Sequence, residues 1–116
     1  MLNVRAIGDV LVVTPAAPTA ITATEARTFD EAASDLPGAA GVVLDLAAVS
    51  FVDSAGIACI VRLSRRLNDG GRELRLAGPS NSVSTVLELV RLHRMVEVYP
   101  SVGEAVESFG AAASSW

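Results

Sequence analysis

The hydrophobic residues of the chain fall into strand-like and helix-like segments, beginning with a strand pair at the N-terminus. Apolar and polar residues alternate over 2–6, which predicts a half-buried strand. A continuous apolar run over 10–13 predicts a strand buried on both faces. Gly8-Asp9 separates the two segments and predicts a two-residue hairpin turn, because glycine accepts positive φ angles.

The rest of the chain alternates between the two kinds of segment. Runs of apolar and β-branched residues predict further strands at 41–46, 74–76 and 96–99. Apolar residues at helical spacing predict helices at 22–36, 54–67, 83–90 and 102–109. Capping-box patterns at 22–25 and 101–104 support the first and last of these helices. The segments 15–19 and 47–52 are expected to be connecting loops.

This order of elements, β-β-α-β-α-β-α-β-α, predicts an α/β fold. We expect a mixed, mostly parallel sheet of about five strands, with one antiparallel edge strand, covered by about four helices. A chain of 116 residues has room for one domain, which we assign to 1–110. Residues 111–116 have no apolar pattern and are expected to form a C-terminal tail that ends in Trp116.

Charge and composition exclude several classes of function. Nine basic residues against 13 acidic ones give a net charge of −4, which argues against a nucleic-acid backbone binder. All nine basic residues are arginine, so no chemistry that needs a lysine ammonium is available. One cysteine and one histidine cannot make an intrachain disulfide or a Cys/His metal cluster. We therefore expect a protein that is not an enzyme and needs no cofactor.

The N-terminus and the longest apolar runs bear on location. No basic segment followed by a long apolar run opens the chain, so no signal peptide is expected. The apolar runs are far shorter than the roughly 20 residues that cross a bilayer. We expect a cytoplasmic protein, and the arginine-only basic composition hints at a bacterial genome rich in G and C.

One motif, Asp53-Ser54-Ala55-Gly56, points to a functional site because it opens a predicted helix. Unpaired N–H groups and the positive dipole end of a helix favour a negative charge at such a position. A phosphate on Ser54 would lie within reach of those groups, and Gly56 would leave the first turn open to another protein. The simpler alternative is that Asp53 or Ser54 only caps the helix. A nucleophile elbow is excluded because Val52 stands where that motif needs glycine.

The stretch Phe51-Val52-Asp53-Ser54-Ala55-Gly56-Ile57 resembles the signature of the STAS domain, the family of bacterial anti-sigma factor antagonists. The similarity extends along most of the chain. It includes the strand before the signature, the turn and strand after its helix, and the acidic residue that opens the last helix. The segments that carry it are 43–46, 70–78, 86–89, Leu92, 98–99 and 104–105.

The resemblance implies a switch that works through binding. In the family, the serine matching Ser54 is phosphorylated by a partner that is both anti-sigma factor and serine kinase, with the ATPase fold of histidine kinases. The unphosphorylated antagonist binds that partner and frees the sigma factor, and a separate phosphatase resets the switch. Many members carry an acid after the second strand where this chain has 17–20, and a glycine where it has Arg91.

Several side chains near the motif have two interpretations. Asp53 either orients the Ser54 hydroxyl or binds the metal-nucleotide site of the kinase, or it caps the helix. Cys59 forms a row with Ala55 and Leu63 that is either partner surface or core. Exposed arginines on the same helix either meet an acidic partner or are simply solvated, and these are Arg62, Arg65 and Arg66. His93 is expected on the surface.

The residues assigned to partner binding are therefore Asp53, Ser54, Ala55, Gly56, Cys59 and Arg62. An alternative function is a STAS scaffold in a stress-sensing assembly, or an accessory subunit of a lipid transporter, which binds without phosphorylation. A nucleotide-binding enzyme of similar build is a further alternative, against which stands the lack of lysine and of a glycine-rich phosphate loop. The oligomeric state stays open, a weak homodimer included.

Overall fold

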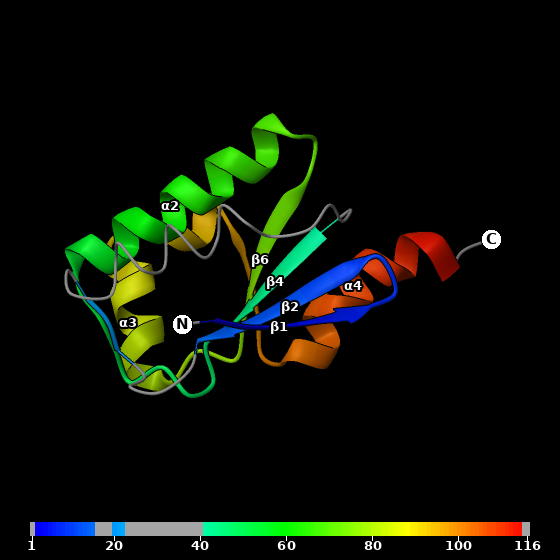
Figure 1. Ribbon diagram of the computed structural model, residues 1–116. Helices are drawn as coiled ribbons and strands as arrows, with labels where there is room; N and C mark the ends of the chain where they lie inside the picture. The colour runs from blue at the N-terminus through cyan, green and yellow to red at the C-terminus, as the bar shows by residue number, and fades with distance from the viewer. Residues whose placement is uncertain (1, 16–19, 23–40, 115–116) are drawn as a thin grey trace.

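The computed structural model describes residues 2–15, 20–22 and 41–114, and a five-stranded mixed sheet forms its centre (Figure 1). The strands are β1 (Leu2–Ile7), β2 (Val10–Pro15), β4 (Gly41–Asp45), β6 (Glu73–Ala77) and β7 (Glu97–Tyr99). They lie in the order β1-β2-β4-β6-β7, with β1 antiparallel to β2 and all other neighbours parallel. The expected sheet with one antiparallel edge strand is confirmed.

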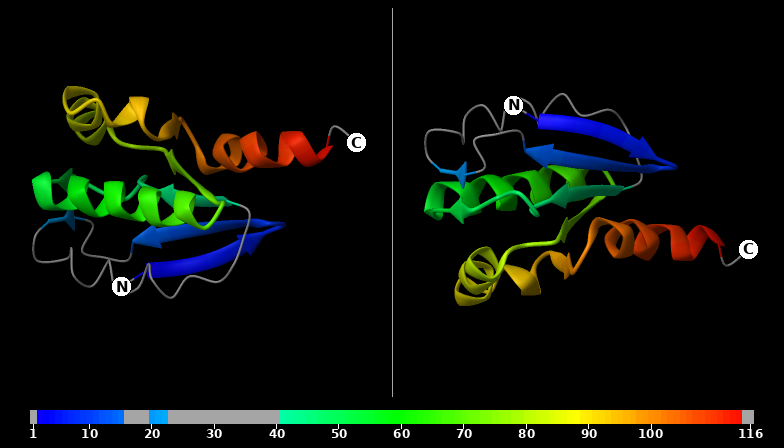
Figure 2. Two further views of the ribbon diagram at one scale, coloured as in Figure 1. Left: turned by 90° about the horizontal axis from the view of Figure 1, so that it is seen from above. Right: turned by 90° about the horizontal axis from the view of Figure 1, so that it is seen from below.

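The N-terminal hairpin forms one edge of this sheet. Its turn lies at Gly8 and Asp9, as the sequence predicts, and Ile7 pairs directly with Val10. Gly8 has φ +60, a left-handed conformation that glycine adopts without steric strain because it has no Cβ. Figure 2 shows the hairpin at one side of the molecule and α3 (Asn81–Leu89), with the 3-10 turn that follows it, toward the other.

Helices cover both faces of the sheet. One face packs against α2 (Ser54–Asp69), α3 (Asn81–Leu89) and the 3-10 turn η1 (Leu92–Arg94). The opposite face packs against α4 (Val102–Ser114) (Figure 1). Successive residues of a strand point to opposite faces, so β4 gives Val42 and Leu44 to the first core and Val43 to the second. The first core is the larger, and deleting one of its buried leucines would cost about 2–5 kcal/mol.

The Phe109 ring is one of the α4 side chains that pack on this face of the sheet, together with Val102, Ala105 and Val106. The Phe109 ring lies over Gly41, where a Cβ would come within 2.6 Å of Phe109 Cδ1. The Arg75 guanidinium stacks 3.9 Å from the centroid of the same ring and also donates to the Ser108 hydroxyl. The cation–π contact and the close approach at Gly41 together fix the position of this helix.

Two short strands were missed by the sequence analysis. β3 (Ala20–Ile21) and β5 (Phe51–Val52) pair in parallel as a separate two-stranded sheet. The expectation that 47–52 is only a loop is therefore wrong for its last two residues. The expected loop at 15–19 is likewise wrong for Pro15, which is the last residue of β2. A two-residue strand is too short to show an alternating pattern, and its partner lies 31 positions away in the chain.

Other differences concern the ends of helices. α3 ends at Leu89, and its buried residues are Val83 and Leu87. Val90, which the sequence places on the apolar face of this helix, is its C-cap and is exposed. α4 runs to Ser114, so the expected lack of regular structure is wrong for 111–114, where three alanines favour helix. The serine cap of α4 is confirmed, since Ser101 Oγ accepts from the Glu104 N–H at 3.2 Å. The helix expected at 22–36 lies outside the described residues except for Thr22, and Trp116 lies outside them as well.

Candidate functional site

The Asp53-Ser54-Ala55-Gly56 motif lies where β5 passes into α2. The ladder between β3 and β5 fixes the chain just before it, with Ala20 opposite Phe51 and Ile21 opposite Val52. The Asp53 N–H extends this ladder by donating to the Ile21 carbonyl at 3.3 Å. The start of α2 is therefore positioned by a segment far away in the sequence.

Asp53 is the N-cap of α2. Its backbone is extended, with φ −99 and ψ −172, and its Oδ1 accepts from the Gly56 N–H at 2.9 Å. Its carbonyl accepts the first backbone bond of the helix, from the Ile57 N–H at 2.9 Å. The sequence left open whether Asp53 or Ser54 caps the helix. The structure shows Asp53 as the cap, so the hydroxyl of Ser54 has no capping role.

Ser54 is the first residue of α2 and is exposed. The backbone N–H groups of Ser54 and Ala55 lie in the first turn of the helix, where no carbonyl of the helix can accept from them. The first turn of α2 carries no acidic side chain. A negative group on the Ser54 oxygen would thus meet two amides and the positive end of the helix dipole.

Gly56 has a different role from the one its position in the motif predicts. It is buried, and a Cβ there would overlap the Ile21 carbonyl oxygen and lie 2.8 Å from Val52 Cγ1. The expectation that Gly56 opens the first turn to a partner is therefore wrong. The glycine faces inward and lets α2 approach β3.

Cys59 also lies inside the molecule. It is fully buried, and Leu63 one turn later belongs to the same core. The interpretation of the row Ala55, Cys59 and Leu63 as partner surface is wrong for its last two members. Arg62 is exposed and lies beside this sulfur, with Nη2 3.2 Å from Cys59 Sγ. Arg65 and Arg66 are exposed as well.

The STAS-domain family model matches residues 1–105 of the chain. The chain belongs to the STAS family. The predicted resemblance is thereby confirmed, and the motif at Ser54 stands at the start of α2 in this STAS domain.

Two kinds of protein stand among the relatives of this STAS domain. A Thermotoga maritima protein named as a candidate anti-sigma factor antagonist is 32% identical over 57% of this chain and 58% of its own length. A candidate sulfate transporter of Arabidopsis thaliana is 33% identical over 65% of this chain and 12% of its own length. This chain thus spans less than two thirds of either relative.

A solved structure agrees over nearly the whole STAS domain. The crystal structure of a candidate anti-sigma factor antagonist from Thermotoga maritima has a TM-score of 0.83 and 25% identity, and the match covers 92% of each chain. In the part of this chain that the structure describes, no helix is long and apolar enough to cross a membrane.

The sequence analysis missed one surface residue of the STAS domain beside the motif. Phe51 is 54% exposed, although it directly precedes the buried Val52. The alternation of a strand explains this, since Val52 points into the core and Phe51 away from it. An exposed phenylalanine three residues before Ser54 is a suitable anchor for a partner protein. Recognising 51–52 as a strand would have revealed it.

This chain departs from the family pattern at the loop 17–20 and at Arg91, and the structure describes only the second of these fully. The loop that lacks the family acid, at 17–20, lies outside the described residues except for Ala20, which pairs with Phe51. Arg91 has φ 59 and ψ 30, so a non-glycine residue takes the left-handed conformation after α3. His93 is exposed, as expected, and the described residues hold no group of three or more potential metal ligands.

Proposed function

We propose that this STAS domain is an anti-sigma factor antagonist whose binding is controlled by phosphorylation of Ser54. Unphosphorylated, it binds an anti-sigma factor and releases the sigma factor. The same partner, a serine kinase with the ATPase fold of histidine kinases, phosphorylates Ser54 and so ends the binding. A serine phosphatase restores the active form.

The observation that carries this proposal is the position of Ser54. Its side chain is exposed at the first turn of a 16-residue helix, and Asp53 has already taken the capping role. The hydroxyl is therefore available for modification without loss of the cap. The names of the Thermotoga relatives support the role of antagonist.

The charge added by phosphorylation explains how binding would end. A phosphoserine carries about −1.5 to −2 charges and a bulky group. The free amides at the start of α2 would hold that phosphate in place, directly beside Phe51 and the Asp53 carboxylate. A partner surface that packs on Phe51 would then meet a fixed, hydrated anion. Removing water from that anion without pairing it with a positive charge costs free energy, so binding is weakened.

The test is a phosphotransfer assay with the anti-sigma kinase from the same organism and ATP, read by intact mass. We expect one phosphate on the wild type and none on Ser54→Ala. Ser82→Ala is the matched control, because Ser82 is also exposed in the first turn of a helix. Phosphate retained on Ser54→Ala would contradict the assignment of Ser54.

Binding to the same kinase tests the switch separately. Ser54→Ala is expected to bind like the wild type, whereas Ser54→Asp should bind at least about tenfold more weakly because the added charge lies at the contact. Ser82→Asp should leave binding unchanged. Tight binding by Ser54→Asp would show that charge does not control the interaction.

A second candidate function is supported by the relative from Arabidopsis thaliana. There the matching segment is 12% of a candidate transporter, so a STAS domain also occurs as part of a much larger protein. On this hypothesis, the domain is an accessory or scaffold that binds constantly. A stable large assembly in solution, with no phosphate on Ser54 after incubation with the kinase, would favour it.

A further inference from the structure

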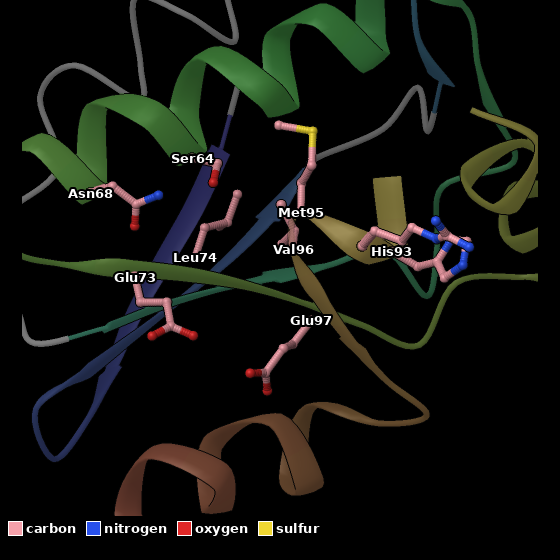
Figure 3. A pocket seen from close by; sticks show the side chains of 9 residues that line it. Ser64, Asn68, Glu73, Leu74, His93, Met95, Val96 and Glu97 are labelled. Carbon is pink, nitrogen blue, oxygen red and sulfur yellow. The ribbon is translucent and has the colours of Figure 1, made fainter. Parts of the chain in front are cut away.

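A pocket of about 230 Å³ opens beside α2, at the end of the sheet where β6 and β7 begin (Figure 3). Ser64 and Asn68 of α2 line it, together with residues of β6 and of the segment from η1 to β7. Ser64 lies ten positions after Ser54, which is about 15 Å along a helix. The pocket is therefore separate from the start of α2, and what it binds does not depend on the proposed function.

Ser64 points into this pocket and is 5% exposed (Figure 3). Among the described residues it is the one buried polar side chain, and its hydroxyl has no hydrogen-bond partner within that part of the chain. Nearly all buried hydroxyls in proteins are paired, because an unpaired one loses its contact with water and gains nothing. The serine in mid-helix also does not bond back to its own helix, which is its usual alternative. A buried hydroxyl that opens onto a pocket in this way points to a ligand.

The strand side of the pocket presents apolar side chains to Ser64. Successive residues of a strand point to opposite faces of a sheet. Leu74 and Val96 belong to the core under α2. Glu73 and Glu97 lie on the opposite face, where their carboxylates pair with the arginine that stacks under α4. Both carboxylates are therefore turned away from the pocket.

Met95 and Asn68 lie at the more exposed side of the pocket. The Met95 side chain is 56% exposed and extends toward α2 (Figure 3). Its unbranched thioether can adapt to the shape of a bound molecule. Asn68 lies four positions after Ser64, on the same side of α2, and its carboxamide has no hydrogen bond within the described residues. The pocket thus combines two polar groups of the helix, each able to donate and accept, with apolar side chains opposite them.

We propose that this pocket binds a small uncharged molecule that carries a hydroxyl or carboxamide group on a short apolar body. The polar end bonds to Ser64 and Asn68, and the apolar body packs against Leu74, Met95 and Val96. A charged end would lose its water beside a buried hydroxyl without meeting an opposite charge from the strands. One water takes about 30 Å³ in the liquid, so the pocket has room for several waters or for one molecule of this size.

The test is an NMR titration of the 15N-labelled full chain with isobutyramide and isobutanol, and separately with isobutyrate and isobutylammonium, which end in a charge. Isobutyramide and isobutanol should shift the amides of Ser64, Asn68, Leu74 and 95–96 in a saturable way at millimolar concentration. The charged probes should bind at least about tenfold more weakly, because the pocket removes water from the charge. No saturable shift with either neutral probe, or a charged probe that binds as tightly as isobutyramide, would overturn the proposal.

Variants identify the groups that hold the probe. Ser64→Ala should weaken binding of isobutyramide about 2–10-fold, because one hydrogen bond is lost. The same variant should melt no lower than the wild type, because it removes a hydroxyl that has no partner in the folded protein. Met95→Ala should weaken binding by a similar factor, about 2–10-fold, through the loss of apolar contact.

Ser82→Ala and Leu89→Ala are the matched controls, because they remove an exposed hydroxyl and an exposed apolar side chain outside the pocket. Both variants should bind isobutyramide like the wild type. Unchanged affinity in Ser64→Ala would overturn the assigned binding mode. A clearly lower melting temperature of Ser64→Ala would overturn the premise that its hydroxyl is unpaired.

Discussion

The carbonyl oxygen of Ile21 occupies the place that a side chain at Gly56 would need. The same Cβ would also lie 2.8 Å from Val52 Cγ1. Because both neighbours belong to the β3–β5 ladder, α2 can approach the ladder only where it carries a glycine. This close contact sets the position of the Ser54 hydroxyl.

Gly56→Ala is therefore expected to destabilise the protein by about 1–3 kcal/mol, because the methyl group meets backbone that cannot move aside easily. Urea denaturation measures the effect. Gly103→Ala is the control, since a Cβ there has only the Ser101 hydroxyl nearby, at 3.8 Å, and alanine favours helix. Equal stability of Gly56→Ala and the wild type would contradict the close packing.

Asp53→Ala should lower stability by about 1 kcal/mol, because the Gly56 N–H loses the carboxylate that caps it. Asp53→Asn should retain most of the stability, since the amide oxygen can accept the same bond. Thermal unfolding of the three proteins provides the comparison. Asp69→Ala, which removes an exposed carboxylate at the other end of α2, should not destabilise.

Phe51→Ala should weaken binding of the anti-sigma partner by about tenfold or more while leaving stability nearly unchanged, because the ring is more than half exposed. Titration calorimetry with the partner measures the affinity. Leu89→Ala removes a comparable exposed apolar side chain from α3 and serves as the control. A similar loss of affinity in both variants would contradict a specific role of Phe51 in binding the partner.

Arg91→Gly should stabilise the protein by up to about 1 kcal/mol. Arg91 is the one described non-glycine residue with positive φ, and glycine adopts that conformation without steric cost. Arg94→Gly, at a residue without positive φ, should instead destabilise by about 0.5–1 kcal/mol. The melting temperatures of both variants should therefore shift in opposite directions.

Gly41 and Phe109 should show strong coupling. Gly41→Ala alone is expected to cost about 1–3 kcal/mol, since the new methyl group displaces the ring. In a Phe109→Ala background the ring is gone, and the same change should cost much less. A double-mutant cycle by urea denaturation measures the difference, and strictly additive effects would exclude direct contact.

The sequence predicts the main sheet well because its strands carry a local signal. The apolar run over 10–13 and the turn at Gly8 each determine an element without reference to the rest of the chain. The motif at Ser54 was found for the same reason, since a cap and the first turn of a helix are local features. The choice of Asp53 as the cap depends on backbone geometry and could not be made in advance.

What the sequence did not show depends on contacts between distant segments. Nothing near Gly56 in the sequence indicates that the Ile21 carbonyl packs against it, so its absent side chain looked like an opening. Cys59 could belong to surface or core until the orientation of α2 was known. The ion pair between Arg75 and Glu97 likewise joins two neighbouring strands, β6 and β7, that only the sheet brings together.

The β3–β5 ladder has a consequence for how a kinase would recognise Ser54. A short peptide around the motif would keep the sequence of the signature but lose the Ile21 carbonyl, which holds the Asp53 amide and packs on Gly56. The substrate would then be a tertiary epitope, present only after residues 20–21 have docked. A misfolded or nascent chain would escape modification, and the switch would act on folded molecules alone.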